Sequence, residues 1–263
     1  MNFQNKTVWI TGASSGIGKA MALEFSKAGA NIILSARNIE KLIEVQQQCA
    51  FSERTQILPL DLSQNETFQE ITKTALGFFE GIDILVNNGG ISQRSLAMET
   101  KLEVDQKLFD INYFGTIALS KAVLPHFVER NSGQIAVITS VVGKIGTPLR
   151  SSYAGSKHAL HGFFDSLRAE ISENITITLI CPGFVNTDVS INALTADGSS
   201  QNKKDKATAN GLSPEVFAKK AVRAIKNKNQ EVVIAGALEK FALFSKRYCP
   251  LLVSRLLRKI DVT

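Results

Sequence analysis

Cysteine is scarce in this chain of 263 residues, which has three: Cys49, Cys181 and Cys249. They are odd in number, widely spaced and never arranged as Cys-x-x-Cys, a pattern that predicts neither a disulfide framework nor a zinc site. The three histidines also lack the spacing of metal ligands with carboxylates. We therefore expect no bound metal, and a reducing compartment.

Long hydrophobic runs are missing as well. No stretch approaches the roughly 20 apolar residues that a membrane-spanning helix needs. The first strand-like segment begins by Thr7, which leaves no room for a signal peptide. These features predict a cytoplasmic protein.

The chain carries a net charge of +6, with 44% apolar and 21% charged residues, values typical of a folded globular protein. The excess of positive charge lies in the segment 240–259, whose six basic side chains are Lys240, Lys246, Arg247, Arg255, Arg258 and Lys259. The rest of the chain has as many acidic as basic residues. A neutral body with a basic tail does not favour a nucleic-acid partner.

Short apolar runs alternate with longer amphipathic stretches along the chain. The expected strands are 7–11, 31–36, 56–60, 82–87, 133–140, 176–181 and 231–235. The expected helices between them are 16–27, 39–50, 63–79, 101–130, 151–173 and 213–228. This alternation predicts a single-domain, doubly wound (Rossmann) α/β fold: a parallel sheet of about seven strands with helices on both faces.

One polar segment interrupts the alternation, at 197–211. A loop of this length in an α/β fold is more often a substrate lid than a domain linker. We therefore assign residues 1–236 to one catalytic domain, with a substrate loop at about 188–212, and residues 237–263 to a C-terminal extension.

A turn rich in small residues follows the first strand and leads into the first helix. Such a turn lets the backbone approach a pyrophosphate, whose charge the amides of the helix N-terminus favour. The residues expected to contact a dinucleotide here are Gly12, Ser14, Ser15, Gly16, Ile17 and Gly18.

The GxxxGxG spacing of this turn resembles that of the short-chain dehydrogenase/reductase family, and the resemblance extends from Thr7 to about Ala235. It implies contacts with the adenosine half of a nicotinamide dinucleotide from segments that follow the third and fourth strands. It also implies that a PGxxxT segment after the sixth strand holds the nicotinamide carboxamide. The matching residues are Asp61, Leu62, Asn88, Gly90, Pro182, Val185 and Thr187.

The end of the second strand indicates which cofactor is used. An NAD enzyme needs an acidic side chain there to bind the ribose 2′-hydroxyl, but this strand ends in Arg37-Asn38. A guanidinium pairs well with a 2′-phosphate and poorly with a bare ribose. We therefore expect NADP(H).

Tyr153 and Lys157 are four residues apart on an expected helix, so they share one face. The ammonium is expected to lower the phenol pKa toward the range in which Tyr153 can exchange a proton with substrate. Ser140 ends the fifth strand and matches the family's serine, which binds the substrate oxygen. Asn112 matches the asparagine that supports a water-linked proton path to the lysine. The resemblance thus implies hydride transfer between nicotinamide and a carbonyl or alcohol, with Tyr153 as general acid/base.

Two alternatives remain open. One is a specific 3-oxoacyl carrier-protein reductase, in place of a reductase acting on free lipid or steroid-like carbonyls. The apolar segment 189–194 favours a hydrophobic substrate. The other alternative is a non-catalytic NADP-binding regulator, which would be expected to have lost Tyr153 or Lys157.

The family also pairs through its fourth and fifth helices, which implies a homodimer or homotetramer. An apolar stripe on the helix at 151–173 fits this role, although it equally fits a core face. The stripe consists of Ala159, Leu160, Phe163, Phe164 and Leu167.

The C-terminal extension combines apolar and basic residues with helical spacing. One face of the segment 251–260 carries Leu252, Val253, Leu256, Leu257 and Ile260. Pro250 is expected to separate this helix from an upstream one. Such a tail predicts either contact with an anionic membrane surface or packing on the protein itself.

Overall fold

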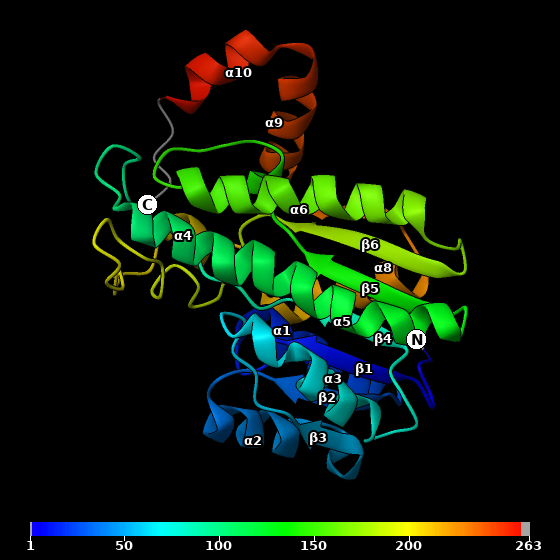
Figure 1. Cartoon of the computed structure of the whole chain (residues 1–263). Coiled ribbons are helices and arrows are strands. Elements are labelled where there is room, and N and C mark those ends of the chain that lie inside the picture. Colours follow the sequence, from blue (N-terminus) through cyan, green and yellow to red (C-terminus); the bar gives the residue numbers. More distant parts are fainter. Residues whose placement is uncertain (1, 259–263) are drawn as a thin grey trace.

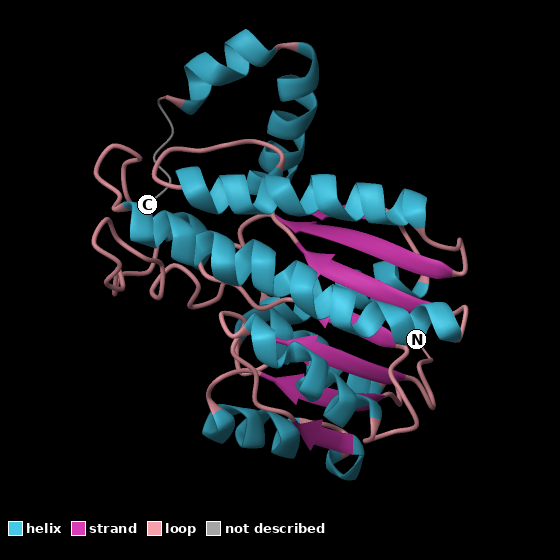
Figure 2. Ribbon diagram, viewed as in Figure 1, coloured by secondary structure: helices cyan, strands magenta, loops and turns pink. Residues whose placement is uncertain are grey.

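A computed structural model of the chain describes residues 2–258 (Figure 1). They form a seven-stranded sheet in the order β3-β2-β1-β4-β5-β6-β7. The strands are β1 (Thr7–Thr11), β2 (Asn31–Ser35), β3 (Thr55–Ile57), β4 (Ile84–Asn87), β5 (Gly133–Ile138), β6 (Ile175–Pro182) and β7 (Glu231–Ile234). All neighbouring strands are parallel, so their arrows point the same way in Figure 2. The predicted doubly wound fold is confirmed.

Helices cover both faces of the sheet. The helices α1 (Gly16–Lys27), α2 (Ile39–Gln48) and α8 (Pro214–Lys226) pack on one face. The helices α3 (Phe68–Leu76), α5 (Gly115–Glu129) and α6 (Ser151–Glu170) pack on the other. In Figure 1, α5 and α6 cross in front of the sheet.

The apolar runs form strands because the sheet buries both of their faces. In β2, Ile32 and Leu34 belong to one core cluster and Ile33 to the other, and all three are fully buried. Alternate side chains of a strand point to opposite faces, so a parallel strand covered on both sides needs a continuous apolar run.

The long helix expected at 101–130 contains a wide turn in its middle. It consists of α4 (Leu102–Phe109), a π-helical turn η3 (Asp110–Phe114) and α5. Single π-turns inside α-helices often occur at functional sites because they redirect side chains. This turn contains Asn112.

The segment predicted as a polar loop differs in one respect: α7 (Lys206–Ala209) forms near its end. The helix α7 begins directly after Asp205, which is almost fully buried, with 1% of its surface exposed. Ion pairs between Asp205 and two arginines hold this part of the loop in place.

The C-terminal extension forms two helices, α9 (Ala237–Tyr248) and α10 (Pro250–Leu257). Pro250 stands in the first turn of α10, as its missing amide hydrogen allows. Both helices project away from the sheet, beyond α6 (Figure 1). Lys259 and Ile260 of the predicted amphipathic helix lie outside the described residues. Among residues 2–258, no helix is long and apolar enough to span a bilayer.

The apolar stripe on α6 lies mainly in the subunit's own core. Leu160, Phe164 and Leu167 are buried against the sheet, and Ala159 and Phe163 are partly exposed. Leu160, Phe164 and Leu167 therefore cannot form a subunit interface, and of the two interpretations of the stripe the core face applies to them.

Candidate active site

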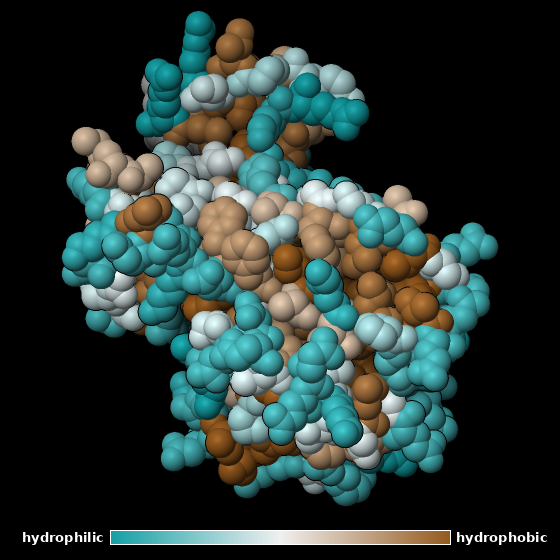
Figure 3. Space-filling view, viewed as in Figure 1, coloured by the Kyte–Doolittle hydropathy of each residue, from teal (hydrophilic) through white to brown (hydrophobic). Residues whose placement is uncertain are grey.

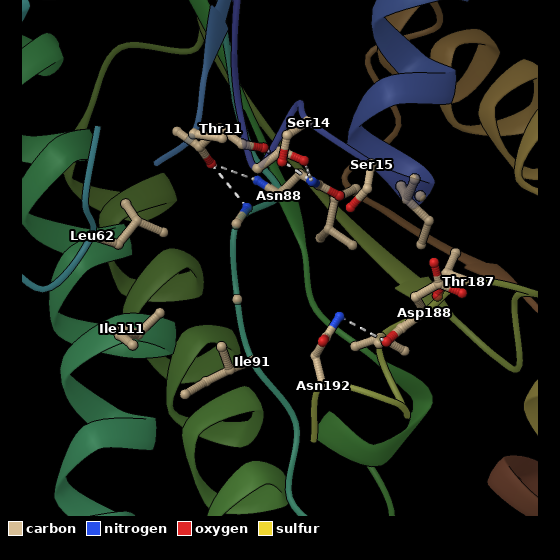
Figure 4. A pocket seen from close by; sticks show the side chains of 18 of the residues that line it. Thr11, Ser14, Ser15, Leu62, Asn88, Ile91, Ile111, Thr187, Asp188 and Asn192 are labelled. Carbon is tan, nitrogen blue, oxygen red and sulfur yellow. Dashed lines mark hydrogen bonds between the residues drawn. The ribbon is translucent and has the colours of Figure 1, made fainter. Parts of the chain in front are cut away.

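A cavity of about 960 Å³ opens at the carboxyl ends of the strands. It lies where the strand order changes direction, between β1 and β4, the usual ligand position in a doubly wound sheet. Of the predicted cofactor and catalytic residues, all but Gly18 and Asn112 line it. Figure 4 shows Ser14 and Ser15 at the start of α1, with Thr187 and Asp188 on the same side of the cavity and Leu62, Ile91 and Ile111 on the other.

The turn after β1 has the geometry that a pyrophosphate requires. Gly12 has φ of +63°, a left-handed conformation that favours glycine. The helix α1 begins with Ser15 as N-cap, and no side chain caps its amides. Free amides at a helix N-terminus favour an anion, so this turn fits a dinucleotide phosphate.

Gly18 has a packing role rather than a lining one. It is buried behind the turn, and a Cβ atom built on it would fall 2.3 Å from the carbonyl oxygen of Gly12. Gly18 therefore does not line the cavity, and its contact with the cofactor stays a prediction. Glycine is needed there for the close approach of α1 to the β1 turn.

Thr11 and Asn88 join the turns that follow β1 and β4 (Figure 4). The Thr11 hydroxyl accepts hydrogen bonds from the amides of Asn88 and Gly89, at 3.0 and 2.9 Å. The Asn88 side-chain amide donates to the carbonyl of Thr11 at 2.9 Å. Sequence reasoning missed Thr11, although it directly precedes the first glycine of the motif.

Two cations line the end of the cavity next to β2. Arg37 is exposed, and Lys41 lies one turn further along, in α2. The side-chain oxygen of Asn38 caps α2, because it accepts a hydrogen bond from the Lys41 amide at 2.8 Å. Lys41 was missed in the sequence, where its four-residue spacing from Arg37 was the available signal.

Asp61 is held ionised beside these cations. Partial burial opposes its charge, but hydrogen bonds from Ser63 and the positive charges of Arg37 and Lys107 outweigh burial and lower the pKa of Asp61. Its Oδ1 accepts from the amide and the hydroxyl of Ser63, at 3.0 and 2.8 Å. This leaves Oδ2 available to a ligand amino group.

Tyr153, Lys157 and Ser140 lie together on the opposite side of the cavity. Tyr153 is hydrogen-bonded to Ser140, whose Oγ also accepts from the amide of Val142 at 3.1 Å. Lys157 donates from Nζ to the Ile138 carbonyl at 2.9 Å. Burial lowers the pKa of Lys157 to about 8.

Burial also raises the pKa of Tyr153, against the hydrogen bond with Ser140 and the charges of Arg150 and Arg94, which lower it. The raised pKa contradicts the prediction that Lys157 lowers it. Burial destabilises the phenolate more than the hydrogen bond and the two positive charges stabilise it. Tyr153 therefore stays protonated at neutral pH.

Asn112 is fully buried behind the cavity. Its Oδ1 accepts from the Ile91 amide at 2.8 Å, and its Nδ2 donates to the Ile91 carbonyl and the Ser156 hydroxyl, at 2.9 and 3.1 Å. A Cβ atom on Gly90 would lie 2.9 Å from Asn112 Oδ1 and 3.6 Å from Lys157 Nζ. Asn112 Oδ1 and Lys157 Nζ therefore both lie beside Gly90.

Comparison with known proteins agrees with this geometry. The family model described as short chain dehydrogenase matches residues 6–197. A "Dehydrogenase/reductase SDR family protein 7-like" of Drosophila melanogaster is 41% identical, over 93% of this chain and 77% of the relative. "Dehydrogenase/reductase SDR family member 7B" of Mus musculus is 40% identical, over 97% of this chain and 81% of the relative.

Solved structures of dehydrogenases also superpose on this chain. An alcohol dehydrogenase from the archaeon Thermococcus sibiricus, complexed with 5-hydroxy-NADP, superposes with a TM-score of 0.75 at 26% identity, covering 88% of this chain and 97% of that one. A short-chain dehydrogenase/reductase from Burkholderia phymatum, in complex with NAD, has a TM-score of 0.85 at 20% identity, covering 100% and 98%. The second likeness concerns the fold alone.

The fold and the cavity define a nicotinamide-dependent oxidoreductase of the Rossmann type. The chain belongs to the short-chain dehydrogenase/reductase family, whose members act on CH–OH and C=O groups.

Proposed function

We propose that this protein is an NADP(H)-dependent oxidoreductase that interconverts a hydrophobic carbonyl compound and its alcohol, with Tyr153 as general acid/base. The observation that carries the proposal is the convergence of Tyr153, Ser140 and Lys157 on one side of a dinucleotide-sized cavity. A non-catalytic regulator would have no need of this arrangement.

Each residue has a distinct part in the reaction. Ser140 donates a hydrogen bond to the substrate oxygen and so orients the carbonyl. Tyr153 gives its phenolic proton to that oxygen as negative charge develops, and takes the proton back in the oxidative direction. A phenol that stays protonated at neutral pH suits the reductive direction. When bound, the nicotinamide supplies or accepts the hydride.

Lys157 and Asn112 support the proton donor. Once protonated, Lys157 stabilises the tyrosinate that forms, and its position beside Gly90 fits contact with the nicotinamide ribose. Asn112 orders the backbone of Ile91 and the hydroxyl of Ser156 behind Lys157. It thereby holds α6 against the π-turn, next to the route by which a water chain reaches the ammonium.

Arg37 and Lys41 support the choice of NADP(H). Both are exposed at the cavity end next to β2, where a 2′-phosphate would have two cations within reach. The strand carries no carboxylate at that position to favour a bare ribose. The archaeal neighbour that holds 5-hydroxy-NADP is consistent with this choice.

The substrate side of the cavity supports a hydrophobic carbonyl compound. Leu194 of the substrate loop packs with Val104 and Leu108 of α4, and Ile91 and Tyr153 join the same apolar cluster. Burial of an apolar substrate against this cluster would stabilise binding by roughly 25 cal/mol per Å² of apolar area.

Oxidation of NADPH with a panel of carbonyl compounds tests the function. The panel holds free aliphatic and steroid ketones together with 3-oxoacyl thioesters, free and attached to a carrier protein. Faster turnover with the free ketones, and with NADPH over NADH, supports the proposal. Turnover of carrier-bound thioesters alone would replace it with carrier-protein reduction, and no turnover with any compound would favour the regulator.

We also propose a homo-oligomer formed through α5 and its neighbours. Figure 3 shows hydrophobic side chains gathered over the region of α5 and α6. Phe114 and Val128 are 47% and 56% exposed there, and Phe163 is partly exposed. Exposed apolar surface of this kind is typical of a subunit interface.

The C-terminal helices, we propose further, rest on an anionic membrane surface. Seven apolar side chains of α9 and α10 are more than half exposed: Leu238, Phe241, Phe244, Tyr248, Leu251, Leu252 and Leu256. Figure 3 shows hydrophobic surface in the projecting lobe, among hydrophilic side chains. The basic residues of this lobe are Lys240, Lys246, Arg247, Arg255 and Arg258. Apolar residues next to cations fit the boundary between anionic headgroups and acyl chains.

A further inference from the structure

Three charged side chains form a buried cluster beside the substrate loop. Nε and Nη2 of Arg94 donate to Oδ2 of Asp205 at 2.9 and 2.5 Å, and Nη2 of Arg150 lies 3.5 Å from the same oxygen. The side chains are 5%, 1% and 4% exposed. Burying three charges is costly, so a cluster retained in the interior calls for a reason.

The cluster joins three elements that are distant in sequence. Arg94 follows β4, Arg150 is the N-cap of α6, and Asp205 is the N-cap of α7 in the substrate loop. The other carboxylate oxygen of Asp205, Oδ1, accepts from Gln201 at 3.0 Å, and the Asp205 amide donates to Ser190 at 3.3 Å. Asp205 thus ties the far end of the loop both to its beginning and to the two arginines.

A second set of bonds holds the loop to the same segment. The amide of Leu194 donates to the Ser92 carbonyl, and the amide of Arg94 donates to the Leu194 carbonyl, both at 2.8 Å. Leu194 packs in the apolar cluster that includes Tyr153. The loop is therefore fixed at the wall of the active site.

The same segment also positions Tyr153 directly. The Oε1 of Gln93, a fully buried residue, accepts from the amides of Ser152 and Tyr153 at 2.9 and 3.2 Å. It provides the capping that no side chain of the α6 N-cap supplies. Leu149, two residues before α6, has φ of +63°, a strained conformation for leucine, and its carbonyl accepts from Ser95 at 3.2 Å.

The charges near Tyr153 come from every element that packs around it. Lys157 belongs to α6, and Arg150, Arg94 and Asp205 form the cluster at its N-terminus. Asp105 of α4 accepts from the neighbouring Ser152 hydroxyl at 2.5 Å. The positive charges of Arg150 and Arg94 both act to lower the pKa of Tyr153. Because one carboxylate lies between two guanidinium groups, the cluster keeps a net positive charge.

We propose that Arg94, Asp205 and Arg150 form a positioning network, which holds the substrate loop closed and sets the positive charge that Tyr153 experiences. The inference rests on the proposed role of Tyr153. The network touches no reacting atom. Its effect on Tyr153 is electrostatic, and its effect on substrate is exerted through the loop wall.

Removing the charges of this network one at a time should shift the pKa of Tyr153 in opposite directions. Asp205→Asn removes the negative charge of the cluster and should lower the pKa of Tyr153, whereas Arg94→Gln removes a positive charge and should raise it, each by roughly 0.5 to 1 unit. Arg94→Lys keeps the charge but loses the two-point contact with Asp205. It should leave the pKa near its original value while weakening the hold on the loop.

Tyrosinate absorbance measures the pKa of Tyr153 in each variant without any substrate. Each variant is titrated by rapid pH jumps, before unfolding, and the same titration in the Tyr153→Phe background is subtracted. Asp165→Asn is the matched control: its carboxylate pairs with Arg168 on the exposed face of α6, at 2.6 Å. Hydrogen exchange of residues 188–212 reports loop closure and should be faster in Asp205→Asn and both Arg94 variants.

Opposite shifts for Asp205→Asn and Arg94→Gln, with Asp165→Asn unchanged, support the network. Shifts of the same sign, or none, would overturn it, because a purely structural role does not follow the sign of the charge removed. If Asp205→Asn fails to fold by circular dichroism, a difference in pKa between Arg94→Gln and Arg94→Lys decides. Failure of the carbonyl panel would reject the proposed function and leave this titration interpretable.

Discussion

Lys157 extends from α6 to the carboxyl end of β5, where its Nζ donates to the carbonyl oxygen of Ile138 at 2.9 Å. Only 5% of the surface of Lys157 is exposed. Burial lowers the pKa of its ammonium group from 10.5 to about 8. The protein thus holds a cation at the base of the cavity against its tendency to lose the proton.

This burial has a consequence for stability. Below pH 8, Lys157 is protonated in both the folded and unfolded chain, and the folded state carries the full cost of the buried charge. Between pH 8 and 10.5 the unfolded chain binds more protons, so the free energy of unfolding due to Lys157 rises with pH. Above pH 10.5 the cost is gone.

Lys157→Met should therefore stabilise the protein at pH 7, by roughly 1 to 3 kcal/mol, while abolishing turnover. Urea unfolding of both proteins between pH 7 and 10.5 measures the difference, which should shrink as pH rises. A variant less stable than the parent at pH 7 would show that the hydrogen bond to Ile138 outweighs the cost of burial.

Tyr153→Phe should keep the fold and cofactor binding and lower kcat at least ~10²-fold, because the proton donor is lost while the ring still packs. Steady-state kinetics with the best carbonyl substrate check this. Tyr248→Phe, on the exposed surface of α9, is the control and should match the parent. Equal kcat in Tyr153→Phe and the parent would remove Tyr153 from the mechanism.

Arg37→Asp should move cofactor preference from NADP(H) toward NAD(H). The change removes a partner of the 2′-phosphate, adds repulsion to it and provides an acceptor for a ribose hydroxyl. We expect the ratio of kcat/KM for the two cofactors to fall at least ~10-fold, and Arg223→Asp on α8 to leave it unchanged. An unchanged ratio in Arg37→Asp would mean that Arg37 does not read the phosphate.

The oligomer is tested by light scattering at micromolar concentration, where we expect the mass of a dimer or tetramer. Phe114→Glu places a charge on the apolar surface next to α5 and should reduce that mass. Phe241→Glu, on α9, should not. A monomeric parent would reject the interface.

The membrane contact is tested by sedimentation with anionic vesicles at low salt. Truncation before α9 is unsuitable, because Glu239 accepts from the Phe184 amide at 2.8 Å and so supports the turn after β6. The double substitution Leu251→Asp and Leu252→Asp changes side chains that are 79% and 56% exposed. We expect the parent to pellet and this variant to stay in solution, with Val216→Asp on α8 as the control that pellets. If the parent also stays in solution, the tail is a structural element.

The sequence by itself determined the architecture and most of the cavity lining. The alternation of buried strands and amphipathic helices leaves few arrangements other than a doubly wound sheet, because each apolar run must be covered on both faces. Local spacing also located the turn at Gly12 and the pair Tyr153 and Lys157, since both depend on residues within a few positions of each other.

Tertiary structure alone decided what depends on residues far apart in the chain. Arg94 and Asp205 are 111 positions apart, and no local pattern marks two such residues as partners. Burial, likewise a property of the whole fold, placed Leu160 and Phe164 of the apolar α6 stripe in the core rather than at an interface. It also raised the pKa of Tyr153, where sequence reasoning had expected Lys157 to lower it, because desolvation depends on every atom packed around the phenol.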